Sequence, residues 1–186
     1  MRHFVYAALF ALALFSLSLA KADQHSEQLP DLLTALGNAV DAVEGHAVEQ
    51  QIWALWLAGP DPAADRLLQQ ARAAADAGQM DNSLEFFNRL TSQFPDYAEG
   101  WNQRAIFHYL LGNIQGSLDD IARALELEPR HFGALAGRGQ CFLRLDRPQD
   151  ALEAFEQSLQ FNPWSETVEQ QIEVLRTYLH DKLTPI

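Results

Sequence analysis

The chain has 186 residues, with 13 Lys or Arg and 25 Asp or Glu, which gives a formal net charge of −12 at pH 7. Such an acidic surface repels nucleic acid and anionic lipid, so we expect no nucleic-acid partner and either a well-solvated protein or one that meets a basic partner. The single cysteine, Cys141, excludes an intramolecular disulfide.

The first 22 residues have the features of a secretory signal peptide. Arg2 precedes an uncharged run over residues 4–20, and Ala20-Lys21-Ala22 offers a small-x-small cleavage site. We expect export and cleavage after Ala22, which leaves a short flexible leader over residues 23–29. The alternative is an uncleaved membrane anchor, because the 17 residues of the run approach the length of a span. After cleavage, no stretch is long and apolar enough for stable membrane insertion.

A repeat governs most of the remaining chain. Pro95, Pro129 and Pro163 lie 34 residues apart, and each follows an amphipathic segment. A fixed 34-residue period predicts a solenoid of helix–turn–helix units, because each unit buries its apolar face only against its neighbours. Alignment on the prolines defines three regular units, which cover residues 64–97, 98–131 and 132–165.

Residues 30–63, before the first regular unit, repeat the pattern in a weakened form. Leu33 and Leu36 fall on apolar positions of the first helix, Trp53 and Trp56 on those of the second, and Gly59-Pro60-Asp61-Pro62 supplies the stop. We interpret this region as a degenerate helix pair that caps the N-terminal end of the stack, because terminal repeats have only one neighbour and are atypical.

The three regular units share a code of small and large residues. Position 4 holds a large apolar wedge, position 8 a small residue that lets two helices approach, and position 15 a residue that tolerates the left-handed turn between helices. In the second unit these are Trp101, Ala105 and Gly112, and Pro129 then ends the second helix. We expect Trp101 to be a buried wedge.

This code resembles that of the tetratricopeptide repeat family, most clearly at Trp101, Ala105, Gly112, Ser117, Ile121, Ala124 and Pro129. The resemblance implies an all-α, right-handed superhelical solenoid of paired antiparallel helices. Two phrases, EGWN-x-RA at 99–105 and EPRHFGAL at 128–135, are further similar to those of a small exported bacterial subfamily. That second resemblance implies a periplasmic location.

The last segment, 166–182, predicts a helix that closes the C-terminal end of the stack. Val168, Ile172, Leu175 and Leu179 recur at helical spacing, and the opposite face is polar, as a cap requires.

Enzyme signatures are absent from the sequence. There is no Gly-rich phosphate loop and no His-Glu-x-x-His, and no two of the six histidines lie at i, i+3 or i, i+4. We therefore predict no catalytic residue, no cofactor and no metal ligand, and a protein that is not an enzyme.

A protein or peptide partner is the expected ligand, held on the concave side that the first helix of each unit lines. That side combines apolar anchors with a few polar groups, which is typical of peptide-binding grooves. The candidate groove residues are Asn102, Ile106, Tyr109, Gln140, Leu143 and Arg144. This predicts an adaptor or assembly factor of the cell envelope. Three alternatives remain open: a semi-exposed solenoid interior without a ligand, an accessory subunit of an envelope enzyme or maturation complex, and a self-associating scaffold, since homo-oligomers are possible.

Arg104 stands at position 7, where the repeat usually carries Leu. A shielded guanidinium there needs a carboxylate, and Asp119 or Asp120 on the paired helix is the candidate partner. For Arg104, Arg130 and His131, a structural role at the turns between units and a role in binding both remain open. The family resemblance also implies that a chaperone-binding role is absent: Asp65 and Leu68 do not match the early positions of the Lys, Asn and Arg set with which chaperone-binding relatives clamp a carboxylate.

Overall fold

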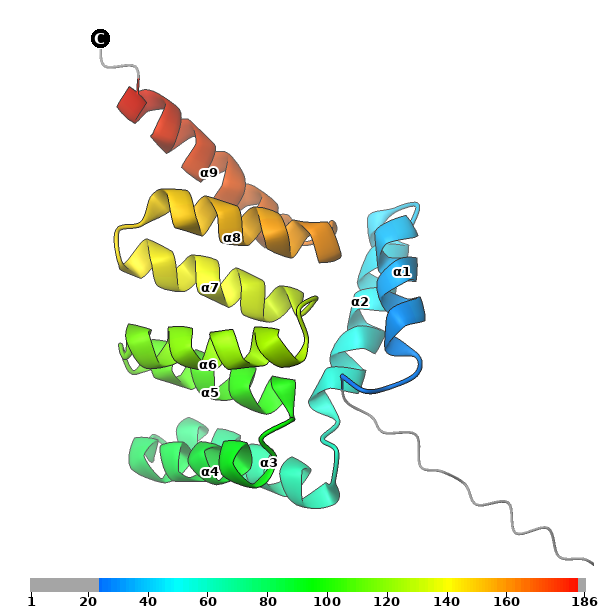
Figure 1. Cartoon of the computed structure of the whole chain (residues 1–186), viewed down its shortest axis with the longest axis vertical. Coiled ribbons are helices and arrows are strands. Elements are labelled where there is room, and N and C mark those ends of the chain that lie inside the picture. The colour runs from blue at the N-terminus through cyan, green and yellow to red at the C-terminus, as the bar shows by residue number, and fades with distance from the viewer. Residues whose placement is uncertain (1–23, 184–186) are drawn as a thin grey trace, which may run out of the picture.

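The computed structural model describes residues 24–183, and this part of the chain contains helices and no strand (Figure 1). The helices are α1 (Leu29–Asn38), α2 (Ala42–Leu57), α3 (Pro62–Asp76), α4 (Met80–Gln93), α5 (Ala98–Leu110), α6 (Ile114–Leu127), α7 (Phe132–Arg144), α8 (Pro148–Phe161) and α9 (Glu166–Leu183). The predicted signal peptide, 1–22, lies outside the described residues. None of the helices in 24–183 combines the length and apolar character needed to cross a bilayer.

The three regular units form three antiparallel helix pairs, α3–α4, α5–α6 and α7–α8, which stack side by side. Each predicted proline, Pro95, Pro129 and Pro163, comes two residues after the second helix of its pair ends. The turn inside each pair uses the left-handed backbone that position 15 predicts, with φ values of 72° at Gly78, 77° at Gly112 and 55° at Asp146. The sequence therefore predicts the three helix pairs and the turns inside them, although α3 begins at Pro62, two residues before the predicted start of its unit at 64.

The small residues at position 8 allow neighbouring helices to approach closely, as predicted. Ala71 and Ala105 are buried at 0% and 1% exposure, and a side chain added at Gly139 would collide with Phe155 of α8. The position-4 wedges are less uniform: Leu67 and Leu135 are buried, whereas Trp101 is only half-buried and its indole N–H donates to Pro95 O at 2.9 Å. The prediction that Trp101 is a buried wedge is therefore wrong, because its indole lies along the edge of the stack to reach that carbonyl.

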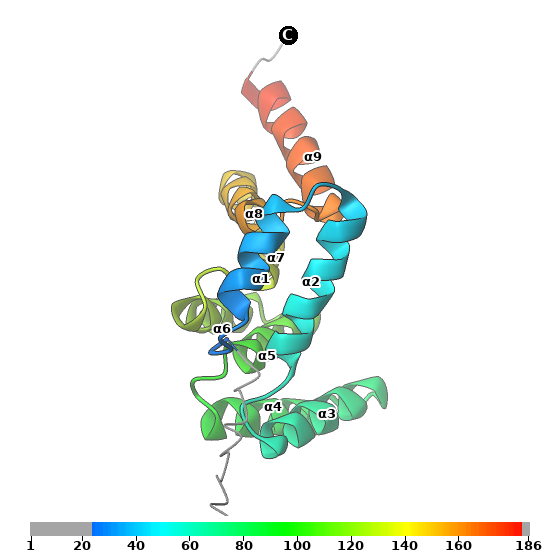
Figure 2. The same cartoon turned by 90° about the vertical axis from the view of Figure 1, so that its right-hand side faces the viewer.

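The N-terminal helix pair exists, but it does not cap the stack. Figures 1 and 2 show α1 and α2 running crosswise to the repeat helices, along one side of the solenoid. The pair contacts α5, α8 and the loops between units rather than stacking on α3. The prediction of an N-terminal cap is therefore wrong. The reason is the apolar surface that the loops offer: Leu29, Leu36, Ile52 and Trp56 form one buried cluster with Phe132.

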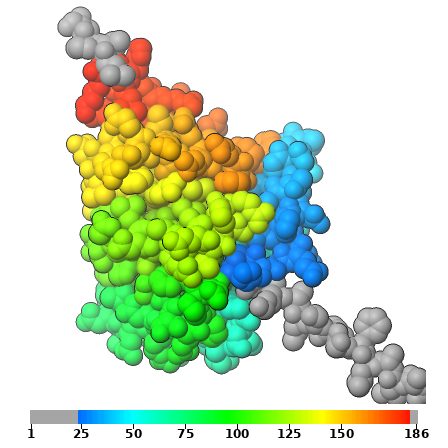
Figure 3. All heavy atoms as spheres, in the orientation of Figure 1, coloured from blue at the N-terminus to red at the C-terminus, as the bar shows by residue number. Residues whose placement is uncertain are grey.

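Helices α1 and α2 form the N-terminal hairpin, and Trp164, in the loop between α8 and α9, contacts it near the turn between these two helices. Its indole N–H donates to Leu36 O at 3.0 Å, and its ring covers Gly45, where an added Cβ would collide with it. The space-filling view shows the hairpin closely joined to the solenoid along this edge (Figure 3). Close approach of helix and indole thus explains the glycine at position 45.

The segment before α1 is attached rather than a flexible leader. Gln24 and Ser26 are 8% and 6% exposed, and the Gln24 side chain accepts a hydrogen bond from Ala98 N at 3.3 Å and donates to Asp96 O. The predicted flexibility of 23–29 is therefore wrong from Gln24 onward.

At the other end of the stack, α9 packs on α8, as predicted for a cap. Val168, Ile172 and Leu175 are buried against Phe155, while Glu169 and Glu173 are exposed.

Candidate peptide-binding face

A small cavity of about 140 Å³ opens between α5 and α7. Its lining includes Asn102, Ile106 and Tyr109 of α5 and Gly137 and Gln140 of α7, with Ile121 of α6 behind them. The structure thus brings together four of the six predicted groove residues. Ile106 is 46% exposed and Leu110, one turn further along α5, is 72% exposed, so the cavity is flanked by apolar surface open to solvent. We call the surface of Ile106, Tyr109, Leu110, Gln140 and Arg144 the α5–α7 face.

The other two predicted groove residues behave differently. Arg144 is exposed, and its guanidinium lies 5.5 Å from the centre of the Tyr109 ring, which places it beside the cavity. Leu143 does not line the cavity. It packs instead against the buried cluster of α8 and α9 that contains Phe155, because its side of α7 faces α8 and the capping helix α9. The structure therefore does not place Leu143 with the other predicted groove residues.

Asn102 lines the cavity but is only 2% exposed, because it belongs to a buried polar cluster at the start of α5. Its side-chain N–H₂ donates to Glu99 Oε2 at 2.8 Å, and Gln103 donates to Glu99 Oε1. Glu99 itself is 1% exposed. A carboxyl group at such burial needs hydrogen-bond donors around it, and Glu99 has three.

The third donor is His131, which is fully buried in the loop before α7. His131 Nδ1 accepts the hydrogen bond of Ala134 N at 3.2 Å and so caps the N-terminus of α7. This assigns the ring proton to Nε2, which lies 2.9 Å from Glu99 Oε2 and donates to it. Both ring nitrogens are therefore engaged, and the role of His131 is to join α5 to α7.

The N-terminal hairpin covers this cluster. The Trp56 ring stacks on His131 with centroids 4.0 Å apart, and the Trp53 ring meets Phe132 edge-on. Tyr97 donates its hydroxyl hydrogen to Trp56 O at 2.9 Å. The Trp56 indole N–H is buried and has no hydrogen-bond partner within residues 24–183. Helix α2 thus borders the α5–α7 face on the side where α5 and α7 begin.

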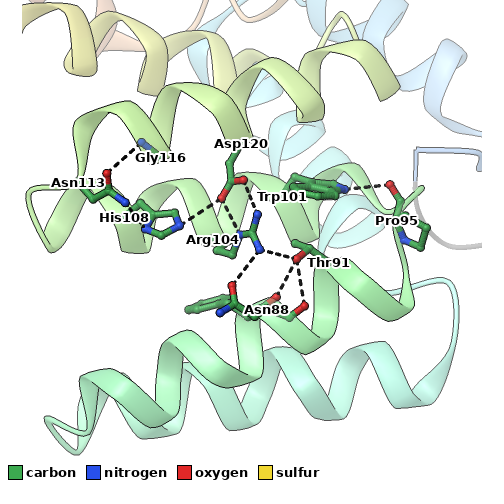
Figure 4. Close-up of polar contacts among 10 residues, drawn as sticks. Asn88, Thr91, Pro95, Trp101, Arg104, His108, Asn113, Gly116 and Asp120 are labelled. Atoms are coloured by element: carbon green, nitrogen blue, oxygen red, sulfur yellow. Dashed lines mark hydrogen bonds and ion pairs between the residues drawn. The ribbon is translucent and has the colours of Figure 1, made fainter.

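Arg104 pairs with Asp120, one of its two predicted partners (Figure 4). Its Nε and Nη2 donate to the two carboxylate oxygens at 2.8 and 2.6 Å, and Nη1 donates to Asn88 Oδ1 and Thr91 Oγ1 of α4. The guanidinium therefore ties α4, α5 and α6 together, on a side of α5 away from the cavity. These contacts support the structural alternative for Arg104, and the guanidinium of Arg130 is bound to Glu128.

Two further titratable groups have shifted pKa values. Burial lowers the pKa of His108, whose Nε2 is 3.8 Å from Asp120 Oδ2; the charge of Asp120 opposes this shift and that of Arg104 adds to it. Burial raises the pKa of the Cys141 thiol, which donates to Ser117 Oγ at 3.2 Å. The thiol is therefore buried, and its reactive thiolate form is disfavoured. Residues 24–183 contain no group of three or more His, Cys, Asp or Glu that could hold a metal ion.

Two features of this region were not predicted from the sequence. The first is Gly137, although a glycine in the middle of a helix is a visible signal. The second is the position of α2 over Glu99 and Asn102, a contact that no local signal could have shown. The phrases at 99–105 and 128–135 have a physical explanation, since they supply Glu99, Asn102, Arg104 and His131.

The comparisons with known proteins agree with this architecture. The tetratricopeptide repeat profile matches residues 68–125 and 111–164. A TPR repeat-containing protein of Rhizobium etli is 30% identical over 149 residues, which cover 80% of this chain and 73% of that protein. The Arabidopsis OM64 TPR domain superposes with a TM-score of 0.59 at 21% identity, covering 62% of this chain and 96% of that domain.

A second solved structure, the first TPR domain of Spaghetti (RPAP3) bound to the HSP90 peptide SRMEEVD, has a TM-score of 0.60 at 17% identity. It covers 63% of this chain and 94% of that chain. At these identities the two superpositions show the shared solenoid fold. The chain belongs to the tetratricopeptide repeat family.

Proposed function

We propose that this chain is a non-catalytic binding module that holds a protein or peptide segment on the α5–α7 face and serves as an adaptor or assembly factor in the bacterial cell envelope. The observation that carries the proposal is the apolar surface of Ile106 and Leu110, 46% and 72% exposed, beside the cavity between α5 and α7. Large apolar side chains that flank a cavity are typical of a surface covered by a partner.

The fold supports this use. The first TPR domain of Spaghetti was solved with an HSP90 peptide bound, so a solenoid of this architecture can accommodate a peptide. The ligand here is expected to be held by different residues. Leu68 is buried and Asp65 Oδ1 accepts the hydrogen bond of Gly59 N at 2.7 Å, so neither position supplies a free cation or amide.

A photo-crosslinking amino acid at position 109 tests the proposal in living cells. The control carries the same amino acid at Glu153, which is exposed on α8. We expect a discrete product at position 109 that is missing at position 153. Identical products at both positions, or none at position 109, would contradict the proposal, and a product of twice the chain mass would identify the alternative of self-association.

Export to the periplasm is part of the same proposal, and the sequence of residues 1–22 supports it. The test is the mass of the chain recovered from a periplasmic extract. A mass that corresponds to a start at Asp23 supports cleavage after Ala22. Full-length chain in the membrane fraction would favour the uncleaved anchor.

A further inference from the structure

Gly137 lies in the middle of α7, where a glycine destabilises a helix relative to alanine. The equivalent position in the other two units is Gln69 and Gln103. Packing does not explain the glycine: an added Cβ would meet only Ile121 Cδ1, at an ordinary contact distance of 3.6 Å. By contrast, a Cβ at Gly133 or Gly139 would collide with Trp53 or Phe155. The stack therefore has room for a side chain at position 137 and lacks one.

The missing side chain leaves the cavity between α5 and α7 open. The cavity has a volume of about 140 Å³ and is walled mainly by Ile106, Tyr109 and Ile121. An apolar cavity of about 150 Å³ is known to hold a benzene molecule in another protein, so this space matches one leucine, methionine or phenylalanine side chain. The buried amide of Asn102 is already bound to Glu99, so the cavity selects mainly for apolar shape.

The charge beside the cavity is positive, although the chain as a whole is acidic. Among the charged side chains of α5 and α7, Glu99 is buried under α2, Arg104 is bound to Asp120, and Arg138 reaches Gln157 on α8. Arg144 stacks on Tyr109 at the cavity and has no carboxylate partner within the described residues. A bound segment with a carboxylate next to its apolar anchor would supply one.

We propose that the cavity created by Gly137 binds a single leucine-, methionine- or phenylalanine-sized side chain of a partner protein, in a segment that carries an acidic residue beside this anchor to pair with Arg144. This inference rests on the proposed function and names the chemistry of its ligand. It also reverses the expectation of a basic partner that the net charge suggests, because the local surface and not the total charge meets the ligand.

Two small probes isolate the two halves of this recognition. N-acetyl-L-leucine has the anchor and a carboxylate, and N-acetyl-L-leucinamide has the anchor alone. We expect the acid to bind the purified protein with a Kd of about 1–10 mM, as usual for so small a ligand. The amide should bind about threefold more weakly, the value of one exposed ion pair. Nuclear magnetic resonance shifts at Ile106, Tyr109, Gly137 and Gln140 report the site.

Substitutions then assign the contacts. Gly137→Leu fills the cavity and should abolish binding of both probes, and Gly137→Ala should weaken both while keeping or raising the melting temperature. Gln69→Leu, at the equivalent exposed position of α3, is the matched control and should bind like the wild type. Arg144→Gln should bind the acid and the amide equally.

The outcomes separate this inference from the proposed function. No shift at these four residues with either probe, or unchanged binding in both folded Gly137 variants, would overturn the anchor site. Equal binding of acid and amide to the wild type would overturn the acidic neighbour. If the crosslink at position 109 persists in Gly137→Leu, the α5–α7 face binds its partner by other contacts, so the inference fails and the proposed function stands.

Discussion

Trp56 stacks on His131, with ring centroids 4.0 Å apart and 11° between the ring planes. His131 presents a fixed surface because hydrogen bonds to Ala134 N and Glu99 hold both of its nitrogens. Trp56 belongs to α2 and His131 to the loop between the second and third repeat units. The contact therefore fastens the N-terminal hairpin to the edge of the solenoid, beside the α5–α7 face.

Trp56→Ala is expected to lower the free energy of unfolding by about 3–5 kcal/mol, because the indole is 1% exposed and its loss leaves a large cavity over His131. Urea denaturation measures the change. Trp56→Phe is the control: it keeps a ring on His131 and removes the unpartnered indole N–H, so the expected loss is below about 2 kcal/mol. An equal loss in both variants would contradict a stacking role.

Trp101→Ala is expected to cost about 2 kcal/mol, roughly half the value for a fully buried tryptophan, because Trp101 is half-buried. The loss includes the hydrogen bond to Pro95 O and the contact with the Arg104 guanidinium, 4.9 Å from the ring centre. Denaturation midpoints of Trp101→Ala and Trp56→Ala, measured side by side, check the order. A larger loss of stability in Trp101→Ala than in Trp56→Ala would contradict the half-buried position of the Trp101 indole.

Glu99→Ala is expected to loosen the hairpin more than the repeats. It leaves the buried donors of Asn102 and His131 without an acceptor, at a cost of about 1–3 kcal/mol each. Because the His131 ring stacks against Trp56 of α2, amide hydrogen exchange in α2 should speed up more than in α3 and α4. Glu85→Ala, an exposed change on α4, should leave the exchange pattern intact. Equal acceleration along the whole chain would show that the cluster supports the solenoid rather than the hairpin.

Arg104→Ala is expected to cost about 3 kcal/mol, since it leaves Asp120, 5% exposed, as an uncompensated buried charge. Arg104→Lys keeps the charge but cannot donate to both carboxylate oxygens and to α4 at once, so it should recover only part of the loss. Thermal unfolding compares the two variants. The Arg147–Asp150 pair, about half exposed on both sides, supplies the control, and Arg147→Ala should have a much smaller effect. Full rescue by lysine would contradict the bidentate geometry.

Acid should destabilise the protein partly through His108. Its pKa in the folded state lies below the ordinary value of 6.5, so the folded protein binds fewer protons than the unfolded chain. The stabilisation is therefore complete above pH 6.5 and is lost as the pH falls through 6.5 towards the lowered pKa. The urea midpoint of the wild type should drop more between pH 7.5 and pH 5.5 than that of His108→Gln. Parallel drops in the two proteins would refute this contribution.

The sequence alone determined the solenoid. The 34-residue spacing of Pro95, Pro129 and Pro163 and the small residues at position 8 predict the three helix pairs, because each of these signals acts inside one unit or between adjacent units. The pairing of Arg104 with Asp120 was predictable for the same reason: both residues lie in one unit, at positions that face each other once the pair forms. Ile106, Tyr109 and Gln140 could likewise be assigned to one surface from helical spacing.

Only the tertiary structure decided where the N-terminal hairpin lies and that it covers Asn102, one of the predicted groove residues. The apolar side chains of Leu36, Ile52 and Trp56 indicate that the hairpin must bury one face against the solenoid. The sequence does not say whether that face packs on the end of the stack or on the loops between units. The choice depends on contacts between distant segments, above all Trp56 with His131 and Trp164 with Leu36. The burial of Asn102 has the same origin, since it results from how separate helices pack, whereas the glycine beside the open cavity is visible in the sequence.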